Sequence, residues 1–131
     1  MLIRSIIQYR LVFKLNKGSS LKSSAEIEQV LSLGKKVSNK YLSIYFLVSN
    51  RLSNSGNKVA VIVGKKAHAQ ANTRNKIKRL VRECLRKSGE LEHFSSGNII
   101  INYHSKDIPS FSLLQKNIKT LFLSLYKKVS S

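Results

Sequence analysis

The sequence predicts a single α+β domain, a sandwich in which helices pack on one β-sheet in the order α-β-β-β-α-β-α. Three observations support this fold class. The length of 131 residues suits one domain. A hydrophobic content of 42% is enough for a folded core. Apolar residues recur at helical spacing in three segments and in short β-branched or aromatic runs in four others. Helices and strands in this order are typical of a layered α+β domain.

Residues 1–20 differ from the rest, because they are apolar and basic and contain no acidic residue. Two interpretations stay open for them. An acid-free segment containing Arg4 and Arg10 is typical of an organelle transit peptide. It is equally typical of a basic arm that becomes ordered on RNA or on its own domain. We favour the arm, and therefore divide the chain into an arm of residues 1–20 and a domain of residues 21–131.

The first half of the domain predicts one helix and three strands. Residues 25–33 form the helix, with Ser23 or Ser24 as its cap and Gly34 as its end. Residues 35–37 and 41–49 follow as strands. Alternation in the second strand places Leu42, Ile44, Phe46 and Val48 on one face, and Tyr41, Ser43, Tyr45 and Leu47 on the other.

A polar turn at residues 52–57 predicts a hairpin between the strand at 41–49 and a third strand at 58–63. Because residues 59–63 are apolar without interruption, we expect the third strand to be central and covered on both faces. A fourth strand follows at residues 98–103. The final helix begins at Ser110 or Ser112, and its apolar seam contains Phe111, Leu114, Ile118, Leu121, Phe122 and Leu125.

The basic helix at residues 72–87 has the clearest pattern in the chain. Seven of its sixteen residues are basic and one, Glu83, is acidic. Its apolar residues at helical spacing are Ile77, Leu80, Val81, Cys84 and Leu85. We expect Asn72 or Thr73 to cap the helix, and Arg79 and Lys87 to pair with Glu83 four residues away. An outer face with so little negative charge indicates an anionic partner.

The charge balance of the whole chain supports the same interpretation. Twenty-four Lys and Arg against six Asp and Glu give a net charge of +18, which is typical of a polyanion binder. A membrane surface is the competing polyanion, but no apolar run reaches the 18 or so residues that a spanning helix needs. The single cysteine, Cys84, lies in the apolar seam and is expected to be buried.

Residues for protein-based catalysis are scarce. A two-metal nuclease needs several converging carboxylates, and this chain has one aspartate and five glutamates spread along it. Its histidines, His68, His93 and His104, lack metal-ligand spacing with Cys84. We therefore predict a polypeptide without catalytic residues or a bound metal of its own. His68 is expected to contact solvent or phosphate, and Lys65 and Lys66 to join the basic helix in one anion-binding surface.

The residues Arg74-Asn75-Lys76-Ile77-Lys78-Arg79-Leu80-Val81-Arg82-Glu83 resemble the signature helix of the bacterial ribonuclease P protein component family, whose pattern is Arg-Asn-x-x-Lys-Arg-x-x-Arg-Glu. The upstream Val63-Gly64-Lys65-Lys66 is similar to the strand end of that family. The resemblance covers roughly residues 21–128 and implies a left-handed βαβ crossover from the third strand through the basic helix to the fourth. That handedness is contrary to the general expectation.

The resemblance also implies a function. The chain would be the protein subunit of an RNA-based endoribonuclease that removes 5′ leaders from precursor tRNA, with Mg²⁺-dependent hydrolysis carried out by the RNA subunit. Its partners would be the catalytic RNA and precursor tRNA, without a membrane or an obligate protein partner. We expect a bacterial cytoplasmic location, with organelle targeting by the arm left open. The alternatives are a ribosomal-type RNA-binding protein without catalysis, and a peripheral membrane binder.

Two groups of site residues follow from the basic pattern and the resemblance together. The first group is expected to bind RNA and comprises Lys65, Lys66, Arg74, Asn75, Lys76, Lys78, Arg79, Arg82 and Arg86. The second group is expected to line a cleft for the single-stranded leader, between the first helix and the sheet. It comprises Tyr45, Tyr41, Ile27 and Leu31.

Overall fold

The computed structural model describes residues 21, 24–48, 58–89 and 97–130. The predicted arm at 1–20 and the predicted turn at 52–57 lie outside these residues. The elements are α2 (Ser24–Leu33), β1 (Lys35–Ser38), β2 (Leu42–Val48), β3 (Lys58–Val63), α3 (Ala71–Ser88), β4 (Gly97–Tyr103) and α4 (Phe111–Ser130). The predicted order α-β-β-β-α-β-α is confirmed.

The four strands form one sheet in the order β1-β2-β4-β3. The predicted hairpin between the second and third strands is wrong, because β4 lies between them. β4 pairs antiparallel with β2 and parallel with β3, so that Ile100 lies opposite both Tyr45 and Ala60. β4 carries three consecutive isoleucines without exposed surface, and a central position buries both of its faces. β3 is therefore an edge strand, and on its edge the Leu21 amide donates to the Val59 carbonyl at 2.9 Å.

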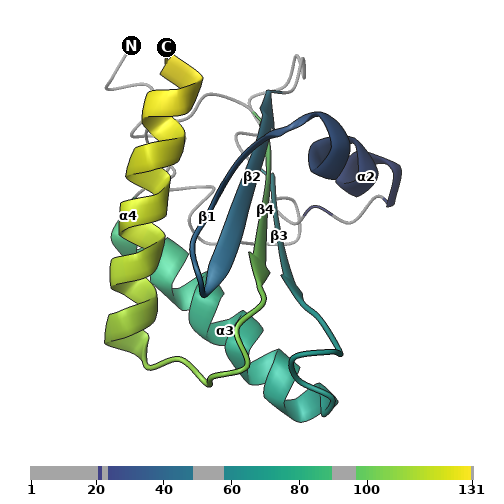
Figure 1. Cartoon of the computed structure of the whole chain (residues 1–131), viewed down its shortest axis with the longest axis vertical. Helices are drawn as coiled ribbons and strands as arrows, with labels where there is room; N and C mark the ends of the chain where they lie inside the picture. Colours follow the sequence, from purple (N-terminus) through teal and green to yellow (C-terminus); the bar gives the residue numbers. More distant parts are fainter. Residues whose placement is uncertain (1–20, 22–23, 49–57, 90–96, 131) are drawn as a thin grey trace.

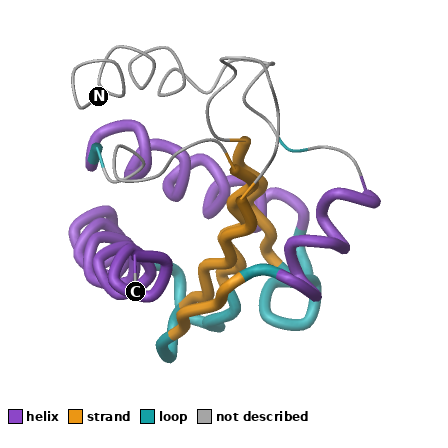
Figure 2. The backbone as a smooth tube through the Cα atoms, turned by 90° about the horizontal axis from the view of Figure 1, so that it is seen from above, coloured by secondary structure: helices purple, strands orange, loops and turns teal. Residues whose placement is uncertain are grey.

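The parallel pair β3 and β4 is joined through α3, as a parallel connection requires. Figures 1 and 2 together show the hand of this crossover. When β3 and β4 point upward and α3 is in front of the sheet, β4 lies to the left of β3. The crossover is left-handed, as the resemblance implied and contrary to the general preference.

The two faces of the sheet carry cores of different size. α3 and α4 cover one face and α2 covers part of the other (Figure 1). The larger core contains Leu42, Ile44 and Phe46 of β2, together with residues of β3, β4, α3 and α4. The smaller core contains Leu21, Val30, Ala60 and Ile100, with Ile27, Tyr45, Leu47 and Ile62 packed against it. Val48, expected on the same face as Leu42, Ile44 and Phe46, lies at the end of β2 and is exposed.

The helix ends differ from the expected caps at one place. α3 begins at Ala71 with Gln70 as a cap residue that makes no side-chain hydrogen bond, so Asn72 and Thr73 lie inside the first turn and do not cap it. α3 ends at Ser88 and is followed by Gly89 as its C-cap, whose φ of 73° is the left-handed conformation that glycine adopts readily. α4 begins as expected, because the Leu113 amide donates to Ser110 Oγ at 3.3 Å. None of the described helices is long and apolar enough to cross a membrane.

Candidate RNA interface

The predicted apolar seam of α3 packs into the larger core. Ile77, Val81, Cys84 and Leu85 have no exposed surface, and Leu80 is partly buried against the same core. Burial raises the pKa of the Cys84 thiol to about 11, so this cysteine is a small apolar side chain at neutral pH. Because the seam is committed to the core, the basic residues of α3 are left on its outer surface.

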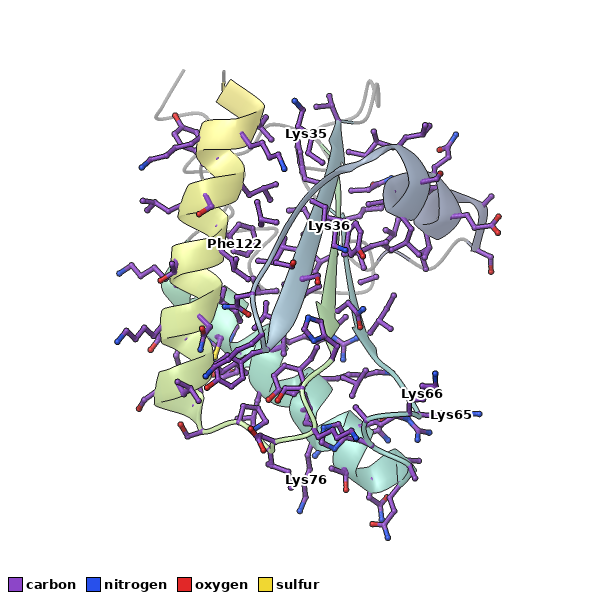
Figure 3. The ribbon with its side chains drawn as sticks, viewed as in Figure 1. Lys35, Lys36, Lys65, Lys66, Lys76 and Phe122 are labelled. Atoms are coloured by element: carbon purple, nitrogen blue, oxygen red, sulfur yellow. The ribbon has the colours of Figure 1, made fainter. Side chains whose placement is uncertain are left out.

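The predicted RNA-binding residues lie on that surface and on the turn that precedes it. Asn75, Lys76, Arg79, Arg82 and Arg86 are exposed, and Arg74 and Lys78 are half-buried. Lys65 and Lys66 are exposed in the turn between β3 and α3. Figure 3 shows them projecting at the end of the molecule where α3 begins, the end from which Lys76 also projects. The structure thus brings the predicted set together on one helix and its entry turn.

The single acid of this helix is used locally. Glu83 pairs with Arg86, three residues on, and with Lys87 Nζ at 3.8 Å. The hydrogen bond from Arg86 lowers the pKa of Glu83. The expected partner Arg79 is not involved, because a glutamate pairs better with a base that follows it than with one that precedes it. Arg86 is therefore engaged by an acid, whereas Arg79 and Arg82 form no ion pair within the described ranges.

Arg74 differs from the other arginines of α3. Its Nη1 donates to two backbone carbonyls of the preceding turn, those of His68 at 3.0 Å and Ala69 at 2.7 Å. His68 is 7% exposed, and its Nε2 donates to the Ser105 carbonyl at 2.8 Å. The expectation that His68 contacts solvent or phosphate is therefore wrong. The ring instead joins the turn before α3 to the segment that follows β4.

The residues expected to line a leader cleft divide between the two faces of the sheet. Tyr45 of β2 and Ile27 of α2 pack against the smaller core, and Leu31 of α2 is 42% exposed. Tyr41 packs against the larger core instead, so its expected place beside Tyr45 is wrong. The reason is that β2 begins at Leu42, and the alternation of the strand does not extend back to Tyr41.

Lys36 is a residue near this surface that the sequence did not single out as a site residue. Its Nζ lies 5.4 Å from the centroid of the Tyr45 ring, because Lys36 and Tyr45 are register partners across β1 and β2. Figure 3 shows Lys36 on β1 directed to the side of the sheet that carries α2. Only the strand pairing reveals this neighbour. An aromatic ring beside a lysine is a combination that can stack a base and contact its phosphate.

Among the described residues, no three His, Cys, Asp or Glu side chains come together as a metal site would require. The acids in this part of the chain are Glu26, Glu28, Glu83 and Asp107. Glu26 accepts a hydrogen bond from Asn98 Nδ2 at 3.3 Å, which joins α2 to β4. Glu83 pairs with Arg86 and Lys87, as described above. Glu26 and Glu83 therefore both have partners within the protein.

Comparison with known proteins decides among the RNA-binding classes. The family model for ribonuclease P matches residues 15–126. The chain belongs to the ribonuclease P protein family. The ribonuclease P protein component of Clostridioides difficile (strain 630) is 35% identical over 109 residues, covering 81% of this chain and 90% of the relative. That of Bacillus velezensis is 30% identical over 119 residues, covering 89% and 99%.

Solved structures of ribonuclease P proteins have the same fold. The Staphylococcus aureus protein aligns with a TM-score of 0.69 at 22% identity, over 81% of this chain and 94% of that one. The Thermotoga maritima protein aligns with a TM-score of 0.65 at 21% identity, over 79% and 94%. The α+β fold class is confirmed. Family membership confirms the predicted function at the level of a ribonuclease P protein component, a subunit of the tRNA-processing ribonucleoprotein.

Proposed function

We propose that this ribonuclease P protein supplies binding surfaces and no catalytic groups. The exposed side of α3, which is rich in lysine and arginine, binds the catalytic RNA together with Lys65 and Lys66. The α2 side of the sheet holds the single-stranded 5′ leader of precursor tRNA. The RNA supplies the Mg²⁺-dependent hydrolysis. A bacterial cytoplasmic location goes with this role, and neither a membrane nor an obligate protein partner is needed.

The observation that carries the proposal is the separation of the two sides of α3. One side is buried without exposed surface, and the other presents lysines and arginines of which only Arg86 and Lys87 pair with an acid in the described part of the chain. Such a surface binds phosphates by neutralising them and releasing their counterions. No three potential metal ligands are grouped in the part of the chain that the structure describes, which supports placing both the metal ion and the hydrolysis on the RNA.

The leader surface is proposed from a second set of contacts. Tyr45 is half-buried in the smaller core with Lys36 beside its ring, and Ile27 and Leu31 of α2 lie on the same side of the sheet. An unpaired base can stack on Tyr45 while Lys36 neutralises the adjoining phosphate. Tyr41, on the other face, is not part of this surface.

The test is cleavage of precursor tRNA by a bacterial ribonuclease P RNA at low Mg²⁺, with and without the protein. We expect the protein to restore cleavage at Mg²⁺ concentrations at which the RNA alone is slow. The lysine and arginine side chains of the bound protein would neutralise phosphates that Mg²⁺ otherwise screens. Failure to restore cleavage would refute the proposal. RNA-free protein is expected to cleave nothing, and Mg²⁺-dependent cutting by such a preparation would contradict the assignment of catalysis to the RNA.

A further inference from the structure

The turn between β3 and α3, residues 64–70, is held in place by a connected set of hydrogen bonds. The His68 amide donates to the Gly64 carbonyl at 3.2 Å and closes the turn that displays Lys65 and Lys66. His68 Nε2 fixes the turn to Ser105 at 2.8 Å. Arg74 Nη1 fixes the other side of the turn through the carbonyls of His68 and Ala69.

We propose that Arg74 is a positioning residue, which holds the Lys65–Lys66 turn against α3 instead of binding an RNA phosphate directly. The identity of the anion that reaches Lys65 and Lys66 rests on the proposed function. The positioning itself does not, because it is a property of the free protein.

The geometry of the guanidinium supports this role. Nη1 carries two hydrogens, and its two carbonyl partners lie 3.0 and 2.7 Å away. Hydrogen bonds from a charged donor are about twice as strong as neutral ones, and two of them from one nitrogen fix the direction of the side chain. Arg79, five residues further along the same helix, is exposed and makes no side-chain hydrogen bond or ion pair among the described residues.

The other side of the turn is attached by a single hydrogen bond from a buried ring. His68 is nearly fully buried, and the Ser105 residue that it contacts is itself fixed, because the Ser105 amide donates to the Tyr41 carbonyl at 3.1 Å. The turn is therefore joined to the segment that follows β4 by His68 and to α3 by Arg74. Removing either attachment leaves the turn held at one side only.

The consequence for binding is preorganisation. Lys65 and Lys66 are exposed on a turn whose backbone is already ordered, so less conformational entropy is lost when they meet an anion. If Arg74 acts through the turn, its removal weakens binding only while Lys65 and Lys66 are present. A direct phosphate contact would instead contribute independently of them.

The first experiment is amide hydrogen exchange on the free, full-length protein. We expect Arg74→Ala to accelerate exchange at the His68 amide and its neighbours in the turn by about tenfold or more, because attachments from a charged donor are lost. Arg79→Ala is the matched control and should leave that exchange unchanged. Unchanged exchange in Arg74→Ala would overturn the inference whether or not the protein binds RNA. His68→Ala, which removes the other attachment, should reproduce the acceleration and serves if Arg74→Ala does not fold.

The second experiment is a double-mutant cycle on binding to a ribonuclease P RNA. Arg74→Ala is expected to weaken binding by about tenfold in the wild-type background, and by less than about twofold in the Lys65→Ala/Lys66→Ala background. Arg79→Ala should cost the same factor in both backgrounds. Equal losses for Arg74→Ala in both would overturn the positioning role. If the wild-type protein binds no RNA, the proposed function fails, and the exchange experiment alone decides the inference.

Discussion

The outer surface of α3 offers a quantitative prediction. Lys78, Arg79 and Arg82 form no ion pair in the described part of the chain, unlike Arg86 and Lys87, and no hydrogen bond to the preceding turn, unlike Arg74. We expect the triple variant Lys78→Ala/Arg79→Ala/Arg82→Ala to fold normally, because alanine suits a helix and none of the three lies in the buried seam. Its free energy of unfolding should change by less than about 1 kcal/mol.

The magnitude follows from counterion release. Each phosphate contact adds about 0.7–0.9 to the slope of log affinity against log salt, so losing three contacts should reduce the slope by about 2–3. Between about 50 and 200 mM salt, the variant should therefore lose about 20- to 40-fold less affinity than the wild-type protein does. The assay is binding of fluorescently labelled ribonuclease P RNA over a series of salt concentrations.

A matched control separates a specific surface from net charge. Lys116, Lys119 and Lys127 are three exposed lysines of α4, and replacing them with alanine removes the same charge from a different helix. This control should change the slope by much less than the α3 variant. Equal slopes for both variants would show that affinity follows total charge, and an unchanged slope in the α3 variant would remove that helix from the interface.

Three further predictions concern single positions. Tyr45→Ala should weaken binding of precursor tRNA with a leader by about 1–3 kcal/mol through lost stacking, and should leave binding of mature tRNA unaffected. In the same binding assay Tyr41→Ala should affect neither RNA, and equal losses in both variants would contradict the leader surface. Burial raises the pKa of the Cys84 thiol from its ordinary value of 9.0 to about 11, so its stabilising contribution is complete below pH 9 and is lost as the pH rises through 11. Urea unfolding of wild type and Cys84→Val should therefore differ by on the order of 2 kcal/mol over this alkaline range, and parallel pH dependences would contradict the prediction. Gly97→Ala should lower the free energy of unfolding by about 1–3 kcal/mol, because the added Cβ would lie 2.5 Å from Phe46 Cε1 and 2.9 Å from the Leu47 carbonyl oxygen. A Cβ added at Gly64 meets nothing within 4 Å, so Gly64→Ala should be neutral or slightly stabilising in the same unfolding measurement.

Local periodicity was sufficient to predict all seven elements and the seam of α3. Each depends on side chains a few residues apart, such as Ile77, Val81 and Leu85, which a helix places on one face. The same reasoning failed for the hairpin, since the turn chemistry near residues 52–57 says nothing about a strand forty residues later. Strand pairing in this sheet is decided by non-local burial of Ile99, Ile100 and Ile101, which requires a neighbour on each side of β4.

The site was predictable in its composition but not in its internal contacts. The basic pattern and the resemblance brought Lys65, Lys66 and the α3 residues together, and the structure places them at one helix and its entry turn. The hydrogen bonds of Arg74 and His68 to backbone carbonyls, and the approach of Lys36 to Tyr45, depend on loop conformation and strand register. Neither is encoded in residue spacing, which explains why His68 and Tyr41 were misplaced.

The balance of energies on α3 explains how the helix tolerates its charge. Arg74, Lys78, Arg82 and Arg86 stand four residues apart, and each such like-charge neighbour pair costs about 0.2–0.5 kcal/mol, or about 1 kcal/mol in all. Full burial of Ile77, Val81 and Leu85 contributes about 1.5–3 kcal/mol for each side chain, which is several times larger. The seam therefore holds the helix in place without help from its outer surface. Since folding depends on one side of α3 and the proposed binding on the other, alanine on the outer side should weaken RNA binding and leave the fold intact.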